Sequence, residues 1–488
     1  MSDALEKRIK KHIIGKPHRF LAVSPLGFEQ TLSRELEIIL GESVTEPPHV
    51  TGDGKVEFTT KLTEAWKAVA VSRIANRVLM EVACFKAENF RDLEKKASEI
   101  PWELYLDERT GNALQTRDES DYSNVTLSDA RKNTSALVIL SKAKDPVKSG
   151  NALNIHVTCK HSRLYHSDAI AERLYKIIGE FCATSQNLYV NFLDDRCTIW
   201  LDLAGEELYK RGFERFVNDA PLKETIASAM IFEAIEILRL RATHGVYPEQ
   251  SRRAQEDTVP ITLIDPMAGS GTFSLEAAYM ASSLIPGICR DFALKHQPAF
   301  KEATWDFLTR RENGQSPTDE RREVAAATIA KIVTSDISER SIEIIKHNIE
   351  CSPLASIAPS ENSPTITPQL RDFFSYTSKE IADLCGDTSP ILVLNPPYGK
   401  RLDFDAPKLY TKIGRHLASL ASGLRQLGKT LSVAILAPKD DTRDGARYTC
   451  TANLLRECPA LSPENNAAAK HIVTSHGGLT LNVLIAKI

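Results

Sequence analysis

The feature that most constrains the fold is an alternation of apolar runs and amphipathic stretches that begins near residue 220. Apolar runs such as "ITLID", "KIVTSD" and "ILVL" are separated by stretches with helical periodicity such as "SERSIEIIKHNIE". Strands that alternate with helices predict a parallel sheet with helices on both faces. The last stretch, residues 471–488, instead has two strand-like runs around a Gly-Gly pair, which predicts an antiparallel hairpin. We therefore predict an α/β, Rossmann-like domain that ends in this hairpin.

The region before residue 206 has the mixed pattern of smaller α+β domains. "FLAVSPLGFEQTLSRELEIIL" predicts a strand, a turn and a helix, and "NLYVNFLDDRCTIWLDL" predicts two strands. The expected organisation is a basic N-terminal arm at 1–18, a ferredoxin-like domain at 19–90, a second α+β domain at 91–205 with a polar insertion at 107–135, and the α/β domain at 206–488.

Composition excludes several classes of protein. The chain is 42 % hydrophobic and 26 % charged, which is close to the average of globular proteins and argues against disorder. Neither a secretory signal nor eighteen consecutive apolar residues occurs, so we expect a cytoplasmic protein without a membrane partner. The nine cysteines lack zinc-ligand spacing, so no metal is expected. With a formal net charge of −3, any nucleic-acid surface has to be local.

A glycine-rich turn, "DPMAGSGTF", follows the first strand of the α/β domain. The strand is predicted to end at Asp265, the chain turns through Gly269 and Gly271, and a helix follows. Glycines permit close backbone approach, and a helix N-terminus offers unpaired N–H groups to an anion. The turn suits a nucleotide-like cofactor, although a turn that only packs strand on helix is the alternative, because Ser274 stands where the dinucleotide fingerprint has its third glycine.

Two acidic residues follow the next two predicted strands. Asp336 could accept both hydroxyls of a ribose, and Asp372 would lie where an adenine edge would be. Each of them alone is more often a helix cap or a turn residue. After successive parallel strands, they describe one ligand that lies across the carboxyl edge of a sheet.

The fourth predicted strand ends in the tetrapeptide Asn395-Pro396-Pro397-Tyr398. An exocyclic amine on a heterocycle is a poor nucleophile, because its lone pair is delocalised into the ring. The side-chain carbonyl of Asn395 and the backbone carbonyl of Pro396 can accept the two hydrogens of such an amine and aim its lone pair at an electrophile. The prolines stiffen the loop and donate no competing hydrogen bond, and Tyr398 offers a face on which a base can stack. The predicted electrophile is the methyl group of S-adenosylmethionine, and the alternative is a Pro-Pro turn that merely ends a buried strand.

These motifs together resemble those of a known family. "DPMAGSGTFSLEAA", "LIPGICRDFA", "TSDISERSIEIIKHN" and "NPPYGKRL" are similar to successive motifs of the THUMP-containing guanine-N2 RNA methyltransferases, above all the bacterial 23S ribosomal RNA enzyme. Upstream, "VTCKHSRLYHSDAIAERL" is similar to the THUMP segment of that family, and "APLKETIASAM" to the helix before its cofactor motif. The enzyme of enteric bacteria carries a fused second methyltransferase half, which we do not expect in this chain.

The resemblance implies a class I methyltransferase domain preceded by a ferredoxin-like domain and, at 91–205, a THUMP RNA-binding domain. It implies S-adenosylmethionine as cofactor, S-adenosylhomocysteine as product and the N2 amine of a guanine in large-subunit ribosomal RNA as the target. The tetrapeptide of Asn395, Pro396, Pro397 and Tyr398 would be catalytic. The positions expected to bind the cofactor are Lys223, Asp265, Pro266, Ala268, Gly269, Gly271, Thr272, Asp336, Ile337, Asp372 and Phe373.

A local basic surface is predicted within the THUMP-like region. Between residues 131 and 176 there are nine Lys or Arg and three acidic residues. Such a surface suits a phosphate backbone, although a solvated helix face is the alternative for any one residue. The residues expected to bind RNA are Lys160, Arg163, His166, Arg173 and, near the catalytic edge, Arg401.

Several other functions remain open at this point. The same chemistry could act on a guanine in tRNA, since THUMP domains also serve tRNA enzymes. The tetrapeptide also serves adenine-N6 methylation of DNA and methylation of a glutamine amide, but the THUMP-like region argues against both. An inactive RNA-binding or ribosome-assembly protein belongs to a different class, and the complete set of motifs disfavours it. A nicotinamide dehydrogenase is disfavoured by the incomplete fingerprint and by the hairpin.

Overall fold

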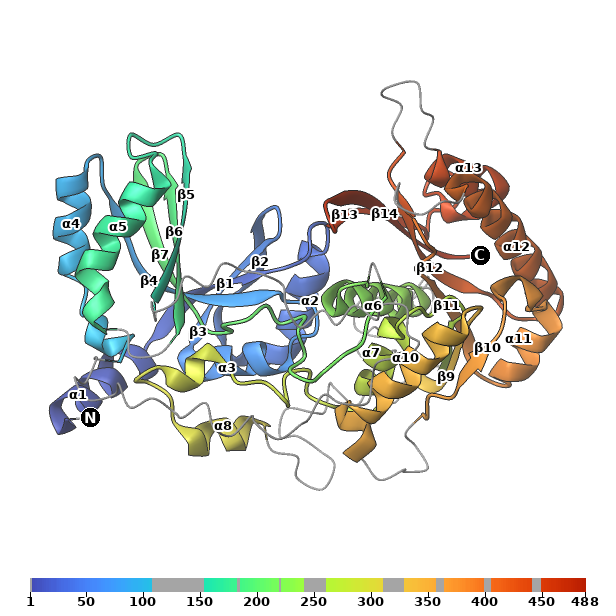
Figure 1. Ribbon diagram of the computed structural model, residues 1–488, viewed down its shortest axis with the longest axis horizontal. Helices are drawn as coiled ribbons and strands as arrows, with labels where there is room; N and C mark the ends of the chain where they lie inside the picture. Colours follow the sequence, from blue (N-terminus) through green and yellow to red (C-terminus); the bar gives the residue numbers. More distant parts are fainter. Residues whose placement is uncertain are drawn as a thin grey trace, which may run out of the picture. The chain divides into compact units, whose positions relative to one another are not determined.

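A computed structural model describes most of the chain in two compact units (Figure 1). The described residues are 2–107, 153–181, 185–218, 221–240, 260–309, 329–356, 364–398, 405–440 and 449–488. Unit 1 comprises Met1–His18, Leu79–Gly205 and Phe292–Glu302, and unit 2 comprises Arg19–Val78, Glu206–Asp291 and Ala303–Ile488. No helix in the described part of the chain combines the length and the apolar character needed to cross a membrane.

Unit 1 contains four neighbouring strands of a sheet, in the order β4-β7-β6-β5. The strands are β4 (Arg77–Lys86), β5 (Leu153–Lys160), β6 (Gln186–Leu193) and β7 (Arg196–Asp202). β7 runs antiparallel to both β4 and β6, and β6 runs parallel to β5. The apolar run "ALVILS" at 136–141, which also predicts a strand, and most of the polar insertion at 107–135 lie outside the described residues.

Two helices cover one face of this sheet, α4 (Phe90–Ser98) and α5 (Ser167–Ile178) (Figure 1). α5 buries Ile170, Leu174 and Ile178, which recur every four residues and so line one face of the helix. They join a core with residues of β6 and β7 such as Val190 and Ile199. Burial alternates along β5, and this period of two leaves every second residue of β5 exposed on the opposite face.

The N-terminal segment of unit 1 is helical. α1 (Asp3–Ile9) is capped by the Ser2 side chain, which accepts a hydrogen bond from the N–H of Leu5 at 3.3 Å, and a π-helical turn continues to Ile14. Ile9 and Ile13 are only 1 % and 2 % exposed, and Arg8 forms an ion pair with Glu103 at 2.7 Å. The basic residues predicted an arm, whereas the structure has a helix anchored by two isoleucines.

Unit 2 begins with a small α+β region at residues 19–78. Its strands β1 (Pro17–Val23), β2 (Val44–Gly52) and β3 (Lys55–Lys61) lie in the order β2-β3-β1, with helices α2 (Glu29–Leu40) and α3 (Leu62–Val71). Glu233 of the helix α6 (Glu224–Leu240) fastens α2 to the rest of the unit, because its carboxylate accepts hydrogen bonds from Thr31 at 2.7 Å and from Arg34. The same carboxylate pairs with Lys470 at 2.6 Å.

The larger part of unit 2 is a seven-stranded sheet in the order β10-β9-β8-β11-β12-β14-β13. The strands are β8 (Ile261–Asp265), β9 (Ile329–Asp336), β10 (Pro368–Leu370), β11 (Ser389–Leu394), β12 (Ser432–Pro438), β13 (Lys470–His476) and β14 (Leu479–Lys487). The first five strands run parallel, and β14 runs antiparallel to both β12 and β13. Gly477 and Gly478 have φ of +58° and +78° in the turn between β13 and β14. The predicted Rossmann-like sheet with a C-terminal hairpin is therefore confirmed.

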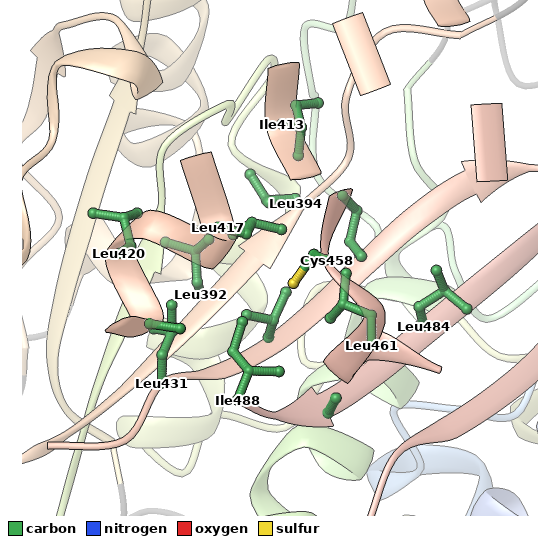
Figure 2. Packing of buried hydrophobic residues seen from close by; sticks show 14 of the residues in the cluster. Leu392, Leu394, Ile413, Leu417, Leu420, Leu431, Cys458, Leu461, Leu484 and Ile488 are labelled. Carbon is green, nitrogen blue, oxygen red and sulfur yellow. The ribbon is translucent and has the colours of Figure 1, made fainter. Parts of the chain in front are cut away.

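Helices pack on both faces of this sheet. They are α6, α7 (Thr272–Ala281), α10 (Glu339–Glu350), α11 (Ser378–Cys385), α12 (Ala406–Gln426) and α13 (Cys450–Glu457), while a further helix, α8 (Glu302–Thr309), precedes β9 in the chain. On one face, Leu392 and Leu394 of β11 meet Ile413, Leu417 and Leu420 of α12 in a single core, shown in Figure 2. Each such side chain contributes roughly 1.5–3 kcal/mol when it is buried. This core holds the carboxyl end of β11 in place.

The order of the strands fixes where a ligand can bind. From β8 the chain moves outward to β9 and β10, and it then returns to β11 on the other side of β8. β8 and β11 are therefore neighbours whose following loops lead in opposite directions, which is the position at which open α/β sheets bind ligands. The residues after Asp265 and those after Leu394 leave the sheet at this edge.

Candidate active site

Asp265 ends β8 and is fully buried. One of its carboxylate oxygens accepts a hydrogen bond from Ser274 Oγ at 2.8 Å, and Thr334 of β9 donates in turn to Ser274 Oγ at 2.8 Å. The other oxygen, Oδ1, is buried and accepts no hydrogen bond from the described residues. Burial raises the pKa of Asp265 to about 7, against the opposing effect of the hydrogen bonds from Ser274. The carboxyl group thus joins β8 and β9 to the first turn of α7.

The glycine-rich turn follows at once. Gly269 and Gly271 have φ of +56° and +79°, a region that favours glycine, and a Cβ added to Gly271 would lie 3.1 Å from the side chain of Ile345. Gly271 is the N-cap of α7. The first N–H groups of a helix have no partner within the helix, so this end of α7 can bind an anionic group.

Asp336 ends β9 and braces this turn. Its Oδ2 accepts a hydrogen bond from the backbone N–H of Gly269 at 2.9 Å, and its Oδ1 accepts one from the N–H of Ser338 at 2.9 Å. Each carboxylate oxygen has a second lone pair, so both can still accept a ligand hydroxyl. The next residue, Ile337, is 71 % exposed and presents an apolar side chain beside this carboxylate.

Asp372 and Phe373 follow β10. Asp372 caps a 3-10 turn, Phe373–Ser375, by accepting a hydrogen bond from the N–H of Phe374 at 3.0 Å. The Phe373 ring is buried in the same core as α12, and its carbonyl accepts a hydrogen bond from His416 Nε2 at 3.1 Å. Burial lowers the pKa of His416, which favours the neutral imidazole. The structure therefore uses the Phe373 side chain for packing and leaves its main chain near the sheet edge.

The tetrapeptide after β11 stands next to the glycine-rich turn in the order of the sheet. Asn395 is half-buried, and its Oδ1 is buried without a hydrogen-bond partner among the described residues. Pro396 is buried and Pro397 is exposed. The Tyr398 hydroxyl is likewise buried without a partner in that part of the chain, and burial raises the pKa of Tyr398 to about 12. Residues 399–404, including Arg401, lie outside the described residues.

Sequence reasoning missed Arg215, a buried arginine that touches the turn. Its guanidinium pairs with Glu224 at the start of α6 and donates to Thr272 and, at 3.2 Å, to Ser270 Oγ. The side chain is only 10 % exposed. A guanidinium presents several donors in a rigid fork, so one residue can tie α6 to the start of α7.

Asn348 of α10 supports the same turn from the other side. Its amide donates to the carbonyls of Ser270 at 3.0 Å and of Phe216 at 2.9 Å, and its Oδ1 accepts the N–H of Phe216 at 2.8 Å. The Phe216 ring stacks on His347 with centroids 3.7 Å apart. The segment 213–218 has no period or motif that could have shown this role from the sequence.

Lys223 has contacts away from the turn. Its ammonium lies 4.4 Å from the centroid of the Tyr209 ring and 4.0 Å from a carboxylate oxygen of Glu207. Its assignment to the cofactor stays a prediction.

The residues predicted to bind RNA lie in unit 1, except Arg401. Arg163 pairs with Glu88 and lies 3.7 Å from Asp195, and Arg173 pairs with Glu94 and stacks on Phe90 at 4.3 Å. These guanidinium groups already have partners that an RNA phosphate would have to displace. Lys160 is exposed, and the His166 ring lies 4.1 Å from the ring of Tyr165, which is 67 % exposed.

The described side chains contain no group of three or more His, Cys, Asp or Glu that could hold a metal ion. A parallel sheet with a C-terminal hairpin, a glycine-rich turn after its first strand and carboxylates after the next two define a Rossmann-like methyltransferase domain.

Comparisons with known proteins identify this class more closely. Residues 255–431 match the family described as the RMKL-like methyltransferase domain, and residues 19–79 match the RlmL ferredoxin-like domain. The chain thus combines an RlmL-like methyltransferase domain with an RlmL ferredoxin-like domain, which confirms the resemblance found in the sequence. S-adenosylmethionine is the cofactor of such a domain. The unpaired start of α7 and the free lone pairs of Asp336 fit it.

Two curated relatives are similar over most of this chain. The ribosomal RNA large subunit methyltransferase K/L of Marinomonas sp. (strain MWYL1) is 26 % identical over 408 residues, which are 82 % of this chain and 46 % of that protein. The protein of the same name from Allochromatium vinosum is 26 % identical over 434 residues, 85 % of this chain and 49 % of that protein. The chain therefore spans about half the length of these relatives.

Solved structures share the fold. A protein from Clostridium difficile 630, described as a possible methylase, superposes with a TM-score of 0.61 at 19 % identity, covering 96 % of this chain and 98 % of that one. The protein SMU.472, solved in complex with S-adenosylhomocysteine, gives 0.60 at 20 % identity over 96 % of this chain and 98 % of that one. TrmN from Thermus thermophilus gives 0.51 at 14 % identity over 96 % of this chain and all of that one.

Proposed function

We propose that this chain transfers a methyl group from S-adenosylmethionine to the exocyclic N2 amine of a guanine in large-subunit ribosomal RNA. The observation that carries the proposal is the Asn395 side-chain carbonyl. It is buried, it accepts no hydrogen bond from the described residues, and it follows β11 at the edge where β8 leads into the glycine-rich turn. A buried acceptor without a partner costs free energy, so its retention suggests a partner supplied by the substrate.

The tetrapeptide would act on the amine as the sequence predicts. Asn395 Oδ1 and the Pro396 carbonyl would each accept one N–H of the guanine amine, which draws the nitrogen lone pair out of conjugation. Tyr398 would provide a stacking face for a base that has left its helix. Bound S-adenosylmethionine supplies an electrophilic methyl group. The cofactor would give up this methyl group to the amine and leave as S-adenosylhomocysteine, and the amine nitrogen, held by Asn395 and Pro396, would give one proton to water.

The cofactor would lie across the turn and the ends of β9 and β10. Gly269, Gly271 and Thr272, with Asp265, Pro266 and Ala268 before them, would place the start of α7 against the cofactor carboxylate. Asp336 would accept the ribose hydroxyls while it keeps its bond to Gly269. Ile337, Asp372 and the Phe373 main chain would surround the adenine.

The choice of RNA rests on the relatives. Both curated relatives described above are named as large-subunit ribosomal RNA methyltransferases, and the match to the RlmL ferredoxin-like domain extends the likeness beyond the catalytic domain. We propose ribosomal RNA or its precursor as the partner, bound in part through Lys160, Arg163, His166, Arg173 and Arg401, and the cytoplasm as the place of action. As part of this proposal we keep the domain boundaries predicted from the sequence, with a THUMP domain at 91–205.

Methyl transfer to separated RNA pools tests the proposal. Purified protein and tritiated S-adenosylmethionine would be incubated with ribosomal RNA and, separately, with tRNA, both from a strain that lacks this gene. Label in N2-methylguanosine of the large ribosomal RNA is the expected result. Label in tRNA would support the proposed methyl transfer but reject ribosomal RNA as the substrate. Absence of label from both naked RNAs and from precursor ribosomal particles would favour an inactive RNA-binding protein.

A further inference from the structure

One face of the unit 1 sheet carries side chains that the core of the unit does not use. On β5, Ile155 and Val157 pack with α4 and α5, whereas Asn154, His156 and Thr158 are exposed on the other face. We call this surface the open face and define it by the outward residues of β5, β6 and the first half of β7. In Figure 1, α4 and α5 lie against the opposite side of these strands.

The open face has an aromatic row. His156 of β5 is paired in register with Tyr189 of β6, and their rings stack with centroids 4.7 Å apart and an interplanar angle of 17°. His156 is exposed and Tyr189 is half-buried. Two stacked rings on a solvated strand pair give a flat π-surface, which can be extended by a further aromatic ring such as a nucleobase.

The next row along the strands offers hydrogen-bonding groups. Thr158, Asn191 and Thr198 are paired across β5, β6 and β7, and Thr158 Oγ1 donates to Asn191 Oδ1 at 2.9 Å. This bond occupies the amide oxygen and orients the amide, so that its NH2 group remains a donor beside the aromatic row. Amide and hydroxyl groups of this kind read the edges of unstacked bases.

The row beyond is cationic. Lys160 of β5 and Arg196 of β7 are each paired in register with Leu193 of β6, and both are exposed. Neither of them has a carboxylate partner among the described residues, in contrast to Arg163 and Arg173. The rise per residue along a strand puts this row roughly 13 Å from the aromatic row.

We propose that the open face binds a single-stranded segment of the RNA substrate, with bases stacked on His156 and Tyr189 and the backbone paired to Lys160 and Arg196. The proposal rests on the RNA substrate proposed above. Charge complementarity favours RNA over a protein partner. The row of Lys160 and Arg196 is positive, and the row between it and the aromatic pair is polar. The open face would hold the substrate through unstacked bases, and the ion-paired Arg163 and Arg173 would contribute less.

The test uses the full chain and fluorescein-labelled oligo(U), a single strand without secondary structure. Binding is measured by fluorescence anisotropy across a salt series. The aromatic double variant His156→Thr/Tyr189→Thr keeps residues that favour strands. We expect its affinity to fall by about fivefold or more, because stacking on aromatic side chains contributes this much per base.

The charge double variant Lys160→Gln/Arg196→Gln separates the second contribution. We expect the slope of log affinity against log salt to become smaller by about 1.4, since each phosphate contact with a single strand contributes about 0.7. Matched controls are Lys176→Gln, an exposed lysine on α5, and Phe307→Leu, an exposed phenylalanine on α8. Both controls should bind oligo(U) as the wild type does, and thermal unfolding identifies any variant that fails to fold.

Unchanged affinity in the folded aromatic variant together with an unchanged salt slope in the charge variant would overturn the proposal. So would a wild-type protein that does not bind oligo(U). If the wild type methylates ribosomal RNA while these variants behave as wild type, the open face is rejected and the proposed function stands. If the variants lose oligo(U) binding in a protein that methylates no RNA, the open face is supported and the proposed function fails.

Discussion

Asp336 Oδ2 accepts a hydrogen bond from the backbone N–H of Gly269 at 2.9 Å, so the carboxylate predicted to meet a ribose also holds the glycine-rich turn. The turn and the ribose site are thereby coupled through one side chain. A defect at Asp336 would disturb both the anion-binding end of α7 and the hydroxyl contacts of the cofactor.

Asp336→Ala should weaken binding of S-adenosylmethionine by about tenfold to a hundredfold, because hydrogen bonds to a charged group contribute roughly 1.5–3 kcal/mol. Isothermal titration calorimetry measures this directly. Glu339→Ala is the matched control, since Glu339 is an exposed carboxylate in the first turn of α10. Equal affinities of the two variants would show that Asp336 has no role in the cofactor site.

The buried carboxyl of Asp265 predicts a pH dependence of stability. Its pKa is raised to about 7 in the folded protein by burial, so the folded state favours the protonated form. The stability that this group contributes is fully present below pH of about 4 and is lost as the pH rises to about 7. Asp265→Asn has no proton to lose. The variant should therefore gain unfolding free energy relative to the wild type as the pH rises across this window.

Urea unfolding of both proteins without cofactor, at a series of pH values from about 4.5 to 8, gives the difference between them. Other carboxyl groups titrate equally in the two proteins and cancel. A difference that stays constant with pH would mean that Asp265 titrates in its ordinary range.

The contacts of Arg215 predict that the glycine-rich turn depends on a residue that belongs to none of the sequence motifs. Arg215→Lys keeps the charge but cannot reach Glu224, Ser270 and Thr272 at once. We expect cofactor affinity to fall by about tenfold and unfolding free energy by about 1–3 kcal/mol, from two or three lost hydrogen bonds. Arg415→Lys, at a pair with Glu457 that is 68 % exposed on the arginine side, is the control and should change stability by less than about 0.5 kcal/mol. Loss of stability with unchanged cofactor affinity would make Arg215 purely structural.

The core beneath β11 predicts a cavity effect. Leu417 of α12 is fully buried beside Leu394, and Leu417→Ala should reduce the unfolding free energy by about 2–5 kcal/mol. Arg425→Ala on the exposed side of α12 should change it by less than about 0.5 kcal/mol. Chemical denaturation compares the two, and equal effects would show that the core around α12 is loosely packed.

The parts of the fold that follow a period could be predicted from the sequence. The strands that end at Asp265, Asp336 and Leu394 show as apolar runs between stretches of helical periodicity, and the hairpin shows as two strand-like runs around Gly477 and Gly478. Strand order is a long-range property, but a parallel sheet with short connections leaves few topologies. The order that puts the glycine-rich turn beside the tetrapeptide was not predicted and is shown by the structure.

What could not be predicted depends on contacts between distant segments. Arg215 reads as an ordinary charged residue, and only the fold shows that it is buried against Thr272. The ion pairs of Arg163 with Glu88 and of Arg173 with Glu94 join residues 75 and 79 positions apart, so composition alone suggested free cations. His156 and Tyr189 likewise meet only because β5 pairs with β6 in a particular register.

Nucleoside analysis of the large ribosomal RNA after reaction with wild-type protein and with Asn395→Ala tests the central proposal most directly. RNA from a strain without this gene would be incubated with each protein and S-adenosylmethionine, digested, and analysed by mass spectrometry. We predict N2-methylguanosine with the wild type and a loss of about a hundredfold or more in its rate of formation with the variant, at unchanged cofactor affinity. A variant that forms N2-methylguanosine at the wild-type rate, or a wild-type protein that methylates a different nucleoside, would contradict the proposal.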